Sequence, residues 1–353
     1  MPSFRTATVS AILRERPGLV RAEVEVHGSG VARAYAVTDL VGPLAVGDEV
    51  VLNTTAVELA LGTGGWHVVH WNLSRGPFTR PGPGHIMKLR YTSLQADTGS
   101  AEEHSADLLA GARDIDGMPV VVGGLHSQVP SVAVALAAAG GGDLRVAYVM
   151  TDGGALPMAL SELVPSMVRA GLLVGTVTAG HAFGGDHEAV NVHSALVVAR
   201  HVLGADVAVV AMGPGSVGTG SALGYSALEV APALDAAQRL GGRPVAVCRF
   251  SLADERPRHQ GVSHHTTTAL GLTASAPVTI GVPEGPHAGR VRGDLAAAGL
   301  VERHALVDVA DPGVPELLAA SGLTVTTMGR GPDTDPAAFA VAGAAGTVAA
   351  TLV

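Results

Sequence analysis

Side chains that can transfer protons or hold a metal gather in Gly180–Asn191, with the sequence GHAFGGDHEAVN. His181, Asp186 and Glu188 lie within eight residues of one another there. Imidazole and carboxylate groups in an open arrangement suit a catalytic divalent metal. The spacing is not that of a zincin helix, because Asn191 stands where that motif has its second histidine. Three interpretations remain: a metal site formed by His181, Asp186 and Glu188, acid–base catalysis by His181 or Asp186, and a helix cap at Asp186.

A second stretch suits the binding of an anion. Val207–Met212 is a continuous apolar run, typical of a strand buried on both faces, and a helix is expected over residues 221–240. Between them lies a glycine-rich loop. Backbone N–H groups and a helix N-terminus at such a junction bind phosphate. The predicted ligand-binding residues of this loop are Gly213, Gly215, Ser216, Gly218, Thr219 and Gly220. The alternative is a tight structural turn.

The glycine loop does not complete a known nucleotide motif. Gly213, Gly215 and Gly218 have the spacing of the dinucleotide fingerprint, but glycine makes up 47 of the 353 residues, so this spacing alone carries little weight. The next expected strand has Arg249 where the fingerprint needs an acid for the ribose. A Walker loop would have lysine where Thr219 stands. Hydrolysis or group transfer is therefore favoured over hydride transfer, and we expect Arg249 to help the loop hold an anion.

Other polar side chains follow other apolar runs of the chain. Ligands of α/β proteins bind at the carboxyl ends of the strands, so we expect these side chains along one edge of a sheet. His126, Asp152 and His264 are predicted to act as acids or bases, and His265 and Arg330 to contact the ligand. The alternative for the adjacent histidines is a surface position in the first turn of a helix.

Lys88 is the only lysine among the 22 basic residues. A buried amine can lose its charge, whereas a guanidinium stays protonated, so arginine cannot replace a lysine that works in its neutral form. We therefore add Lys88 to the predicted catalytic residues. The alternative is that Lys88 has no special function and is present by chance in a sequence that otherwise uses arginine.

The elements that position these residues fall into two expected domains. Residues 1–75 contain short alternating segments such as Val20–Val26, separated by frequent turns, which predict a barrel-like β domain. Residues 76–86 have the proline and glycine content of a linker. Residues 87–353 alternate apolar runs with helical segments, which predicts a mostly parallel, Rossmann-like sheet covered by helices. A (βα)8 barrel is the alternative; the open sheet is favoured because the glycine loop falls mid-chain, near a place where the strand order could reverse.

Composition excludes several classes of function. The net charge of −9, without a basic run, argues against a nucleic-acid partner. No apolar run reaches the roughly 18 residues of a membrane span, and no signal peptide is visible. Cys248 is the only cysteine, which fits a reducing cytoplasm. We expect a cytoplasmic protein with an anionic small-molecule ligand, a divalent metal as the one candidate cofactor, and a homodimer as the commonest oligomer.

Six longer strings of the sequence are distinctive. They are HIMKLRYTSLQ (His85–Gln95), TDGGALP (Thr151–Pro157), GHAFGGDHEAVN (Gly180–Asn191), AMGPGSVGTG (Ala211–Gly220), SHHTTTALG (Ser263–Gly271) and TTMGRGPDTDP (Thr326–Pro336). Together they resemble an uncharacterised bacterial family, domain of unknown function 3866, over nearly the whole chain. The resemblance implies a shared design but no activity, and it transfers no catalytic residue.

Two hypotheses about function follow from the residues. The first is an enzyme, a hydrolase or transferase, that binds a phosphorylated or nucleotide-like ligand at the carboxyl ends of the strands. The second is a non-catalytic protein that senses a metabolite at the same place. Turnover of a bound ligand distinguishes them.

Overall fold

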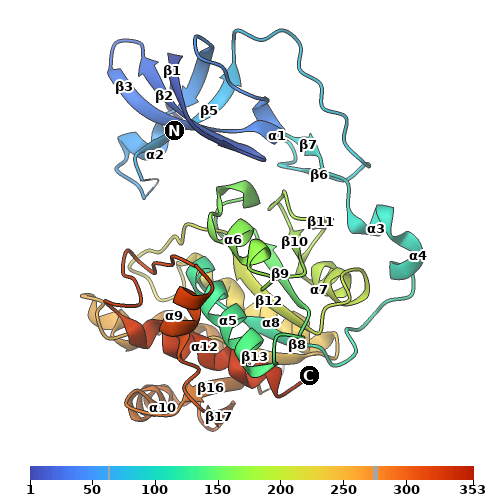
Figure 1. The fold of residues 1–353 in the computed structure, drawn as a ribbon, viewed down its shortest axis with the longest axis vertical. Helices are drawn as coiled ribbons and strands as arrows, with labels where there is room; N and C mark the ends of the chain where they lie inside the picture. Colours follow the sequence, from blue (N-terminus) through green and yellow to red (C-terminus); the bar gives the residue numbers. More distant parts are fainter. Residues whose placement is uncertain (63, 273–276) are drawn as a thin grey trace. The chain divides into compact units, whose positions relative to one another are not determined.

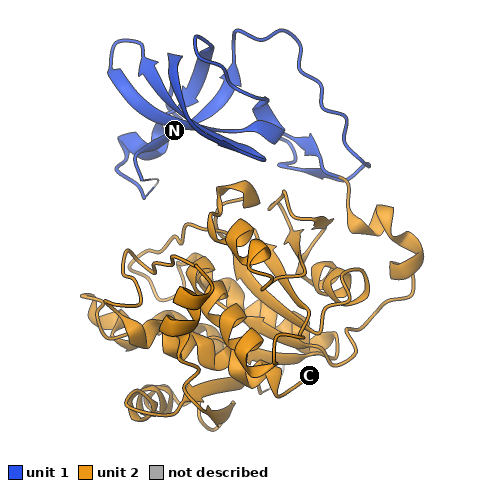
Figure 2. Ribbon diagram, viewed as in Figure 1, with its two compact units in different colours: residues 1–98 blue, residues 99–353 orange. Residues whose placement is uncertain are grey.

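The structure, a computed structural model, describes residues 1–62, 64–272 and 277–353. The chain divides into two compact units, residues 1–98 and 99–353 (Figure 2). The expected linker at 76–86 and Lys88 therefore both belong to the first unit. Within the described residues, none of the helices has the length and apolar character needed to cross a bilayer.

The first unit is built on a closed five-stranded barrel (Figure 1). Its strands follow the order β1-β2-β3-β5-β4 around the barrel. They are β1 (Phe4–Arg16), β2 (Leu19–Val26), β3 (Gly30–Val37), β4 (Glu49–Asn53) and β5 (Trp66–Asn72). The long β1 pairs with both β2 and β4, and its register shifts beside β2 mark bulges, which bend a strand as closure requires. This confirms the predicted barrel.

Shorter elements complete the first unit. They are α1 (Thr38–Val41), α2 (Thr55–Glu58), β6 (Met87–Lys88) and β7 (Ala96–Asp97). The barrel core consists of small and medium apolar side chains, among them Ala7, Val24, Ala34 and Leu52, whose alternation along the strands matches the period of two seen in the sequence.

The second unit contains an open sheet of eight parallel strands in the order β11-β10-β9-β12-β8-β13-β16-β17. The strands are β8 (Pro119–Val122), β9 (Val146–Thr151), β10 (Gly175–Ala179), β11 (His187–Ala189), β12 (Val207–Met212), β13 (Arg243–Ala246), β16 (Thr279–Pro283) and β17 (Ala305–Val309). Since β11 and β17 are edges, the sheet does not close, and the Rossmann-like prediction is confirmed over the (βα)8 alternative.

Helices cover both faces of this sheet (Figure 1). One face packs against α5 (Val129–Ala139), α6 (Leu163–Arg169), α11 (Val314–Ala320) and α12 (Pro336–Ala350). The other packs against α7 (Val192–His201), α8 (Val230–Arg239), α9 (His264–Leu272) and α10 (Ala288–Ala297). Helices α5 and α12 approach closely because Gly346 has no side chain: a Cβ there would lie 2.4 Å from the Val132 carbonyl oxygen. The remaining elements are α3 (Ala101–His104), α4 (Ala106–Leu109), β14 (Phe250–Ser251), β15 (Gly261–Val262), and the 3-10 turns η1 (His126–Gln128), η2 (Met158–Leu160), η3 (Ser226–Glu229) and η4 (Pro257–His259).

The order of the strands creates a switch point between β8 and β12. These strands are neighbours, yet α5, which follows β8, and α8, which follows β12, lie on opposite faces of the sheet. Chains that diverge in this way leave a crevice outside the carboxyl ends of the two strands, where ligands of open α/β sheets bind. The glycine loop follows β12 and therefore lies at this point.

Candidate functional site

The glycine loop forms hydrogen bonds within itself and does not lead directly into a helix. Regular structure resumes only at η3, and α8 begins at Val230, so the prediction of a helix from residue 221 is wrong about its start. The physical reason is a bridge within the loop: Thr219 N–H bonds to the Gly224 carbonyl, and Ser226 N–H bonds to the Val217 carbonyl. Residues 215–223 are exposed. The loop is therefore presented to solvent above the switch point, separate from any helix N-terminus.

The glycines of the loop have two different roles. A Cβ on Gly213 would lie 2.3 Å from the carbonyl oxygen of Ala155, so this glycine is required for close packing against the loop after β9. Gly215 has a φ of +98° and no atom within 4 Å of an added Cβ. Gly220 also faces open space. The structural-turn interpretation thus fits Gly213, while the exposed glycines leave their backbone accessible.

Arg249 emerges at the carboxyl end of the sheet, three residues after β13. Its N–H donates to Thr266 Oγ1 at 2.9 Å, and its carbonyl accepts from Ser263 N–H at 2.8 Å, so the backbone is fastened to the start of α9. Nη1 of its side chain lies 3.1 Å from Nδ1 of His265. Burial, together with the positive charge of Arg256, lowers the pKa of the guanidinium to about 10. Among the described residues, no carboxylate lies within ion-pair distance of this half-buried cation.

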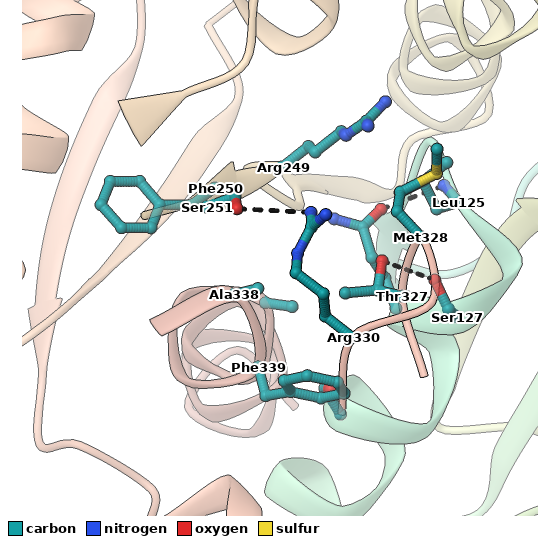
Figure 3. A pocket seen from close by; sticks show the side chains of 13 residues that line it. Leu125, Ser127, Arg249, Phe250, Ser251, Thr327, Met328, Arg330, Ala338 and Phe339 are labelled. Atoms are coloured by element: carbon teal, nitrogen blue, oxygen red, sulfur yellow. Dashed lines mark hydrogen bonds between the residues drawn. The ribbon is translucent and has the colours of Figure 1, made fainter. Parts of the chain in front are cut away.

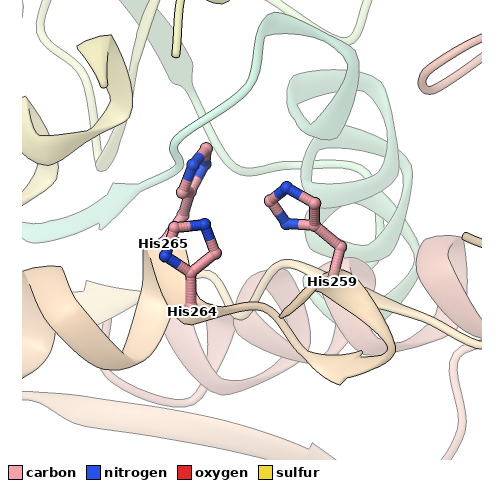
Figure 4. Close-up of side chains that lie close together, drawn as sticks. All are labelled: His259, His264 and His265. Atoms are coloured by element: carbon pink, nitrogen blue, oxygen red, sulfur yellow. The ribbon is translucent and has the colours of Figure 1, made fainter. Parts of the chain in front are cut away.

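Three histidines lie close together (Figure 4), and one of them, His265, contacts Arg249. One ring nitrogen from each of His259, His264 and His265 lies within 4.8 Å of the others. His265 stacks on Tyr225 with a centroid distance of 3.9 Å, and the Tyr225 hydroxyl donates to the His265 carbonyl at 3.0 Å. Burial, reinforced by the charge of Arg249, lowers the pKa of His265 to about 3 and that of His259 to about 4. Both rings are therefore neutral at pH 7.

The other arginines of this edge are largely neutralised by carboxylates. Asp254 bonds to Arg256 at 2.8 Å and to Arg330 at 3.2 Å, and Asp335 lies 3.4 Å from Arg330. The Arg256 guanidinium holds the pKa of Asp254 well below its usual range. Arg330, predicted as a ligand contact, is thus engaged in the protein's own ion pairs. Arg258 is exposed and reaches the glycine loop through the Thr219 carbonyl, at 3.5 Å.

Arg249 lies between two small cavities. One is lined by Ser127, Ser251 and Arg330, among others, and holds about 20 Å³ (Figure 3). The second, lined by Gly124, His265 and α8, holds about 20 Å³ as well. Each has room for about one water molecule. A ligand larger than water therefore has to reach Arg249 from its open side.

Glu229 is a titratable residue of this edge that the sequence did not reveal. Thr151, at the end of β9, donates to its carboxylate, as does the backbone N–H of Gly153. Burial, with the charge of Asp152 adding to it, raises the pKa of Glu229 to about 7. A Cβ on Gly153 would lie 2.3 Å from the carboxylate, so glycine is needed for this approach. In the sequence, Glu229 is an unremarkable acid before a helix, and no motif marks it.

A family model for proteins of unknown function (DUF3866) matches residues 33–346. The chain belongs to this family. The match confirms the resemblance seen in the six strings and covers both units. Neither the curated proteins nor the solved structures include a significant match.

In this DUF3866 member, His126 is part of the core rather than of an open site. Its Nδ1 lies 3.0 Å from the Tyr148 hydroxyl, and its Nε2 lies 2.7 Å from Ser161 Oγ. Burial lowers the pKa of His126 to about 4. Both ring nitrogens are occupied, so its observed contacts are structural ones.

Asp152 and His181 are neighbours at the carboxyl edge, because Asp152 accepts a hydrogen bond from His181 N–H at 2.9 Å. Asp186 instead bonds to the N–H and hydroxyl of Thr176, near the start of β10, at 2.9 and 2.8 Å. His181 follows the end of that strand, so the loop carries the two residues to opposite ends of β10.

The proposed metal ligands are not gathered into one set. Glu188 bonds to the Thr178 hydroxyl at 2.5 Å and to Gly184 N–H at 2.7 Å, which ties the loop down. Within the described ranges, neither group with metal-binding geometry includes His181, Asp186 or Glu188. Lys88 is buried on β6 of the first unit.

Proposed function

We propose that the carboxyl edge at the β8–β12 switch point binds a phosphorylated or nucleotide-like small molecule and supports its hydrolysis or group transfer. The observation that carries this proposal is Arg249, a half-buried guanidinium without a carboxylate partner among the described residues. Withdrawing a charge from water is costly unless an opposite charge meets it. The neighbouring arginines Arg256 and Arg330 have such partners, whereas Arg249 has a neutral imidazole. An anionic ligand would supply the missing charge.

The surroundings of Arg249 fit this ligand. Arg258 adds a second cation without a carboxylate partner in the described part of the chain, and it reaches the glycine loop. The exposed backbone of Gly215, Gly218 and Gly220 offers N–H groups, of the kind that bind phosphate oxygens. Guanidinium forks and backbone donors together are the usual means of holding a phosphate. A ligand at the crevice would lie within reach of this loop.

Glu229 supports a catalytic rather than a purely binding role. A carboxyl group with a pKa of about 7 exchanges protons readily at neutral pH. In hydrolysis, it would take a proton from the attacking water and pass it to the leaving group. In transfer, an acceptor hydroxyl would replace the water.

A second candidate function is a non-catalytic sensor. It is favoured by the contacts of His126 and Asp186, which are occupied by the protein's own groups. Under this function, ligand binds without turnover, and Glu229→Gln leaves the affinity for ligand nearly unchanged.

The test is a thermal-shift panel of nucleotides and sugar phosphates, followed by calorimetry and product analysis for each compound that binds. Arg249→Met should weaken binding at least tenfold. Arg239→Met is the matched control, because Arg239 is exposed at the C-terminal end of α8. Equal affinity in both variants would remove Arg249 from the site. Binding without product would favour the sensor.

The remaining expectations concern the protein's setting. A net charge of −9 supports a small-molecule ligand over nucleic acid. The single cysteine supports a cytoplasmic location, and a homodimer is proposed as the commonest oligomer.

A further inference from the structure

The cluster of His259, His264 and His265 has a geometry that anion binding alone does not explain. The three side chains come from a short segment, the end of η4 and the first two residues of α9. Their rings face a common gap (Figure 4), with one nitrogen of each within 4.8 Å of the others. Three imidazoles that converge in this way offer three nitrogen donor atoms to one point.

His264 provides a second, independent sign of a ligand. Its Nε2 is buried and has no hydrogen-bond partner among the described residues. Buried polar atoms in proteins nearly always have a partner, so one without a protein partner is a place where an ion can bind.

The other two rings are held as metal ligands usually are. His259 Nδ1 lies 2.7 Å from the Ser263 hydroxyl, which leaves Nε2 for an ion. His265 is fixed by its stack on Tyr225 and by the bond from the Tyr225 hydroxyl to its carbonyl. Histidines that bind metal typically have the second nitrogen or the ring oriented by such a neighbour.

We propose that His259, His264 and His265 bind one divalent transition metal of the zinc class, with a fourth coordination position open. Imidazole donors select zinc, cobalt, nickel or copper over magnesium and calcium. Tetrahedral bonds of about 2.0 Å place the donor nitrogens about 3.3 Å apart. The three nitrogens already lie within 4.8 Å of one another, so any remaining approach needs only small side-chain rotations.

The ion would also act on Arg249. A guanidinium only donates hydrogen bonds, so Arg249 requires an unprotonated Nδ1 on His265. If the ion binds Nδ1 of His265, the lone pair that accepts the hydrogen bond from Arg249 is used by the metal. If the ion binds Nε2, the proton of the neutral ring moves to Nδ1, which can then no longer accept a hydrogen bond. In both cases Arg249 must leave His265. Metal binding thereby frees this cation for an anion, and Arg249 competes with the metal through both its hydrogen bond and its charge.

The experiment is a titration of the full chain with Co²⁺, after treatment with a chelator that is then removed, followed by displacement with Zn²⁺. We expect about one tightly bound Co²⁺ per chain, with the visible absorption of a four- or five-coordinate nitrogen site. His264→Asn should weaken binding at least tenfold, and Arg249→Met should strengthen it. His201→Asn is the matched control, since His201 lies in a separate group with the exposed Asp114 and Asp116, and its replacement should leave binding unchanged.

Three results would overturn the proposal. They are the absence of Co²⁺ binding at micromolar concentrations, an unchanged spectrum in His264→Asn, and loss of the spectrum in His201→Asn alone. Circular dichroism and a thermal melt confirm that each variant is folded; His264 is chosen because its side chain is only partly buried and its Nε2 bonds to no described residue. The probe is the metal alone, so a chain that binds Co²⁺ but no phosphate compound contradicts only the proposed function.

Discussion

Arg249 and His265 lie side by side at the carboxyl edge of the sheet, with Nη1 3.1 Å from Nδ1. The cation thus shares a hydrogen bond with a neutral ring, and its charge is not balanced there. Nearby, Asp254 and Asp335 pair with Arg256 and Arg330. Carboxylates of this edge therefore neutralise Arg256 and Arg330, whereas the charge of Arg249, three residues after β13, is left without a carboxylate among the described residues.

Replacing Arg249 should change the stability of the protein and its affinity for ligand in opposite directions. The half-buried charge costs free energy in the protein without ligand, so Arg249→Met should raise the free energy of unfolding by about 1 kcal/mol. The same variant should lose affinity for phosphate compounds. Urea unfolding with and without ligand measures both effects. A variant less stable than the parent chain by more than about 1 kcal/mol would mean that Arg249 is mainly structural.

Glu229 should make stability fall as the pH rises. Its pKa in the folded chain, about 7, lies above the ordinary value of 4.5, so the folded state binds the proton more tightly. The stability it contributes is fully present below about pH 4.5 and is lost as the pH rises through 7. Glu229→Gln should therefore be more stable than the parent at pH 8.5, by about 1–3 kcal/mol, and similar at pH 4.5. Unfolding in urea at the two pH values measures this difference, and equal differences at both would contradict the raised pKa.

The sheet could be predicted from the sequence because a strand that is buried on both faces is a continuous apolar run. The apolar run Val207–Met212 is β12 with the same bounds, and the position of its loop predicted the reversal of strand order. Backbone hydrogen bonds within the loop could not be foreseen. The bridge between Gly218 and Tyr225 depends on a turn whose residues, glycine and serine, are compatible with several conformations.

The candidate site was predicted only in part, because the sequence shows which residues follow a strand but not which distant residues they contact. His264 and His265 were found because they begin a helix after an expected strand, whereas His259 joins them only through η4. Glu229 has no local signal, because its pKa depends on Thr151 and Gly153, about 80 positions away. Distant contacts decide which of several polar residues along an edge face one another.

Gly213 and Gly215 should respond differently to alanine. At Gly213 the new Cβ would lie 2.3 Å from a backbone oxygen, so the chain must shift, and we expect a loss of about 2–4 kcal/mol of stability. At Gly215 the space is open, and only the φ of +98° opposes the side chain, at a cost of about 1 kcal/mol. Thermal unfolding of the two variants measures the contrast. If Gly215→Ala also reduces phosphate binding while the protein stays folded, the exposed backbone of the loop takes part in the site; unchanged affinity would count against it.

His126 should prove to be a stability residue that resists protonation. Its pKa in the folded chain, about 4, lies below the ordinary 6.5, because the ring is buried between Tyr148 and Ser161. The unfolded chain binds the proton first, so the stability due to His126 is full above pH 6.5 and is lost as the pH falls towards 4. The parent chain should therefore lose up to about 3 kcal/mol of stability from this group over that interval.

His126→Gln should be less stable than the parent at pH 7.5 by about 2 kcal/mol, and its stability should fall less steeply on acidification. Urea unfolding between pH 4 and 7.5 measures both curves, and parallel curves would show that another group controls the acid transition. If the folded variant also keeps its affinity for phosphate compounds, the role of His126 is to hold η1 against β9 through Tyr148 rather than to touch the ligand.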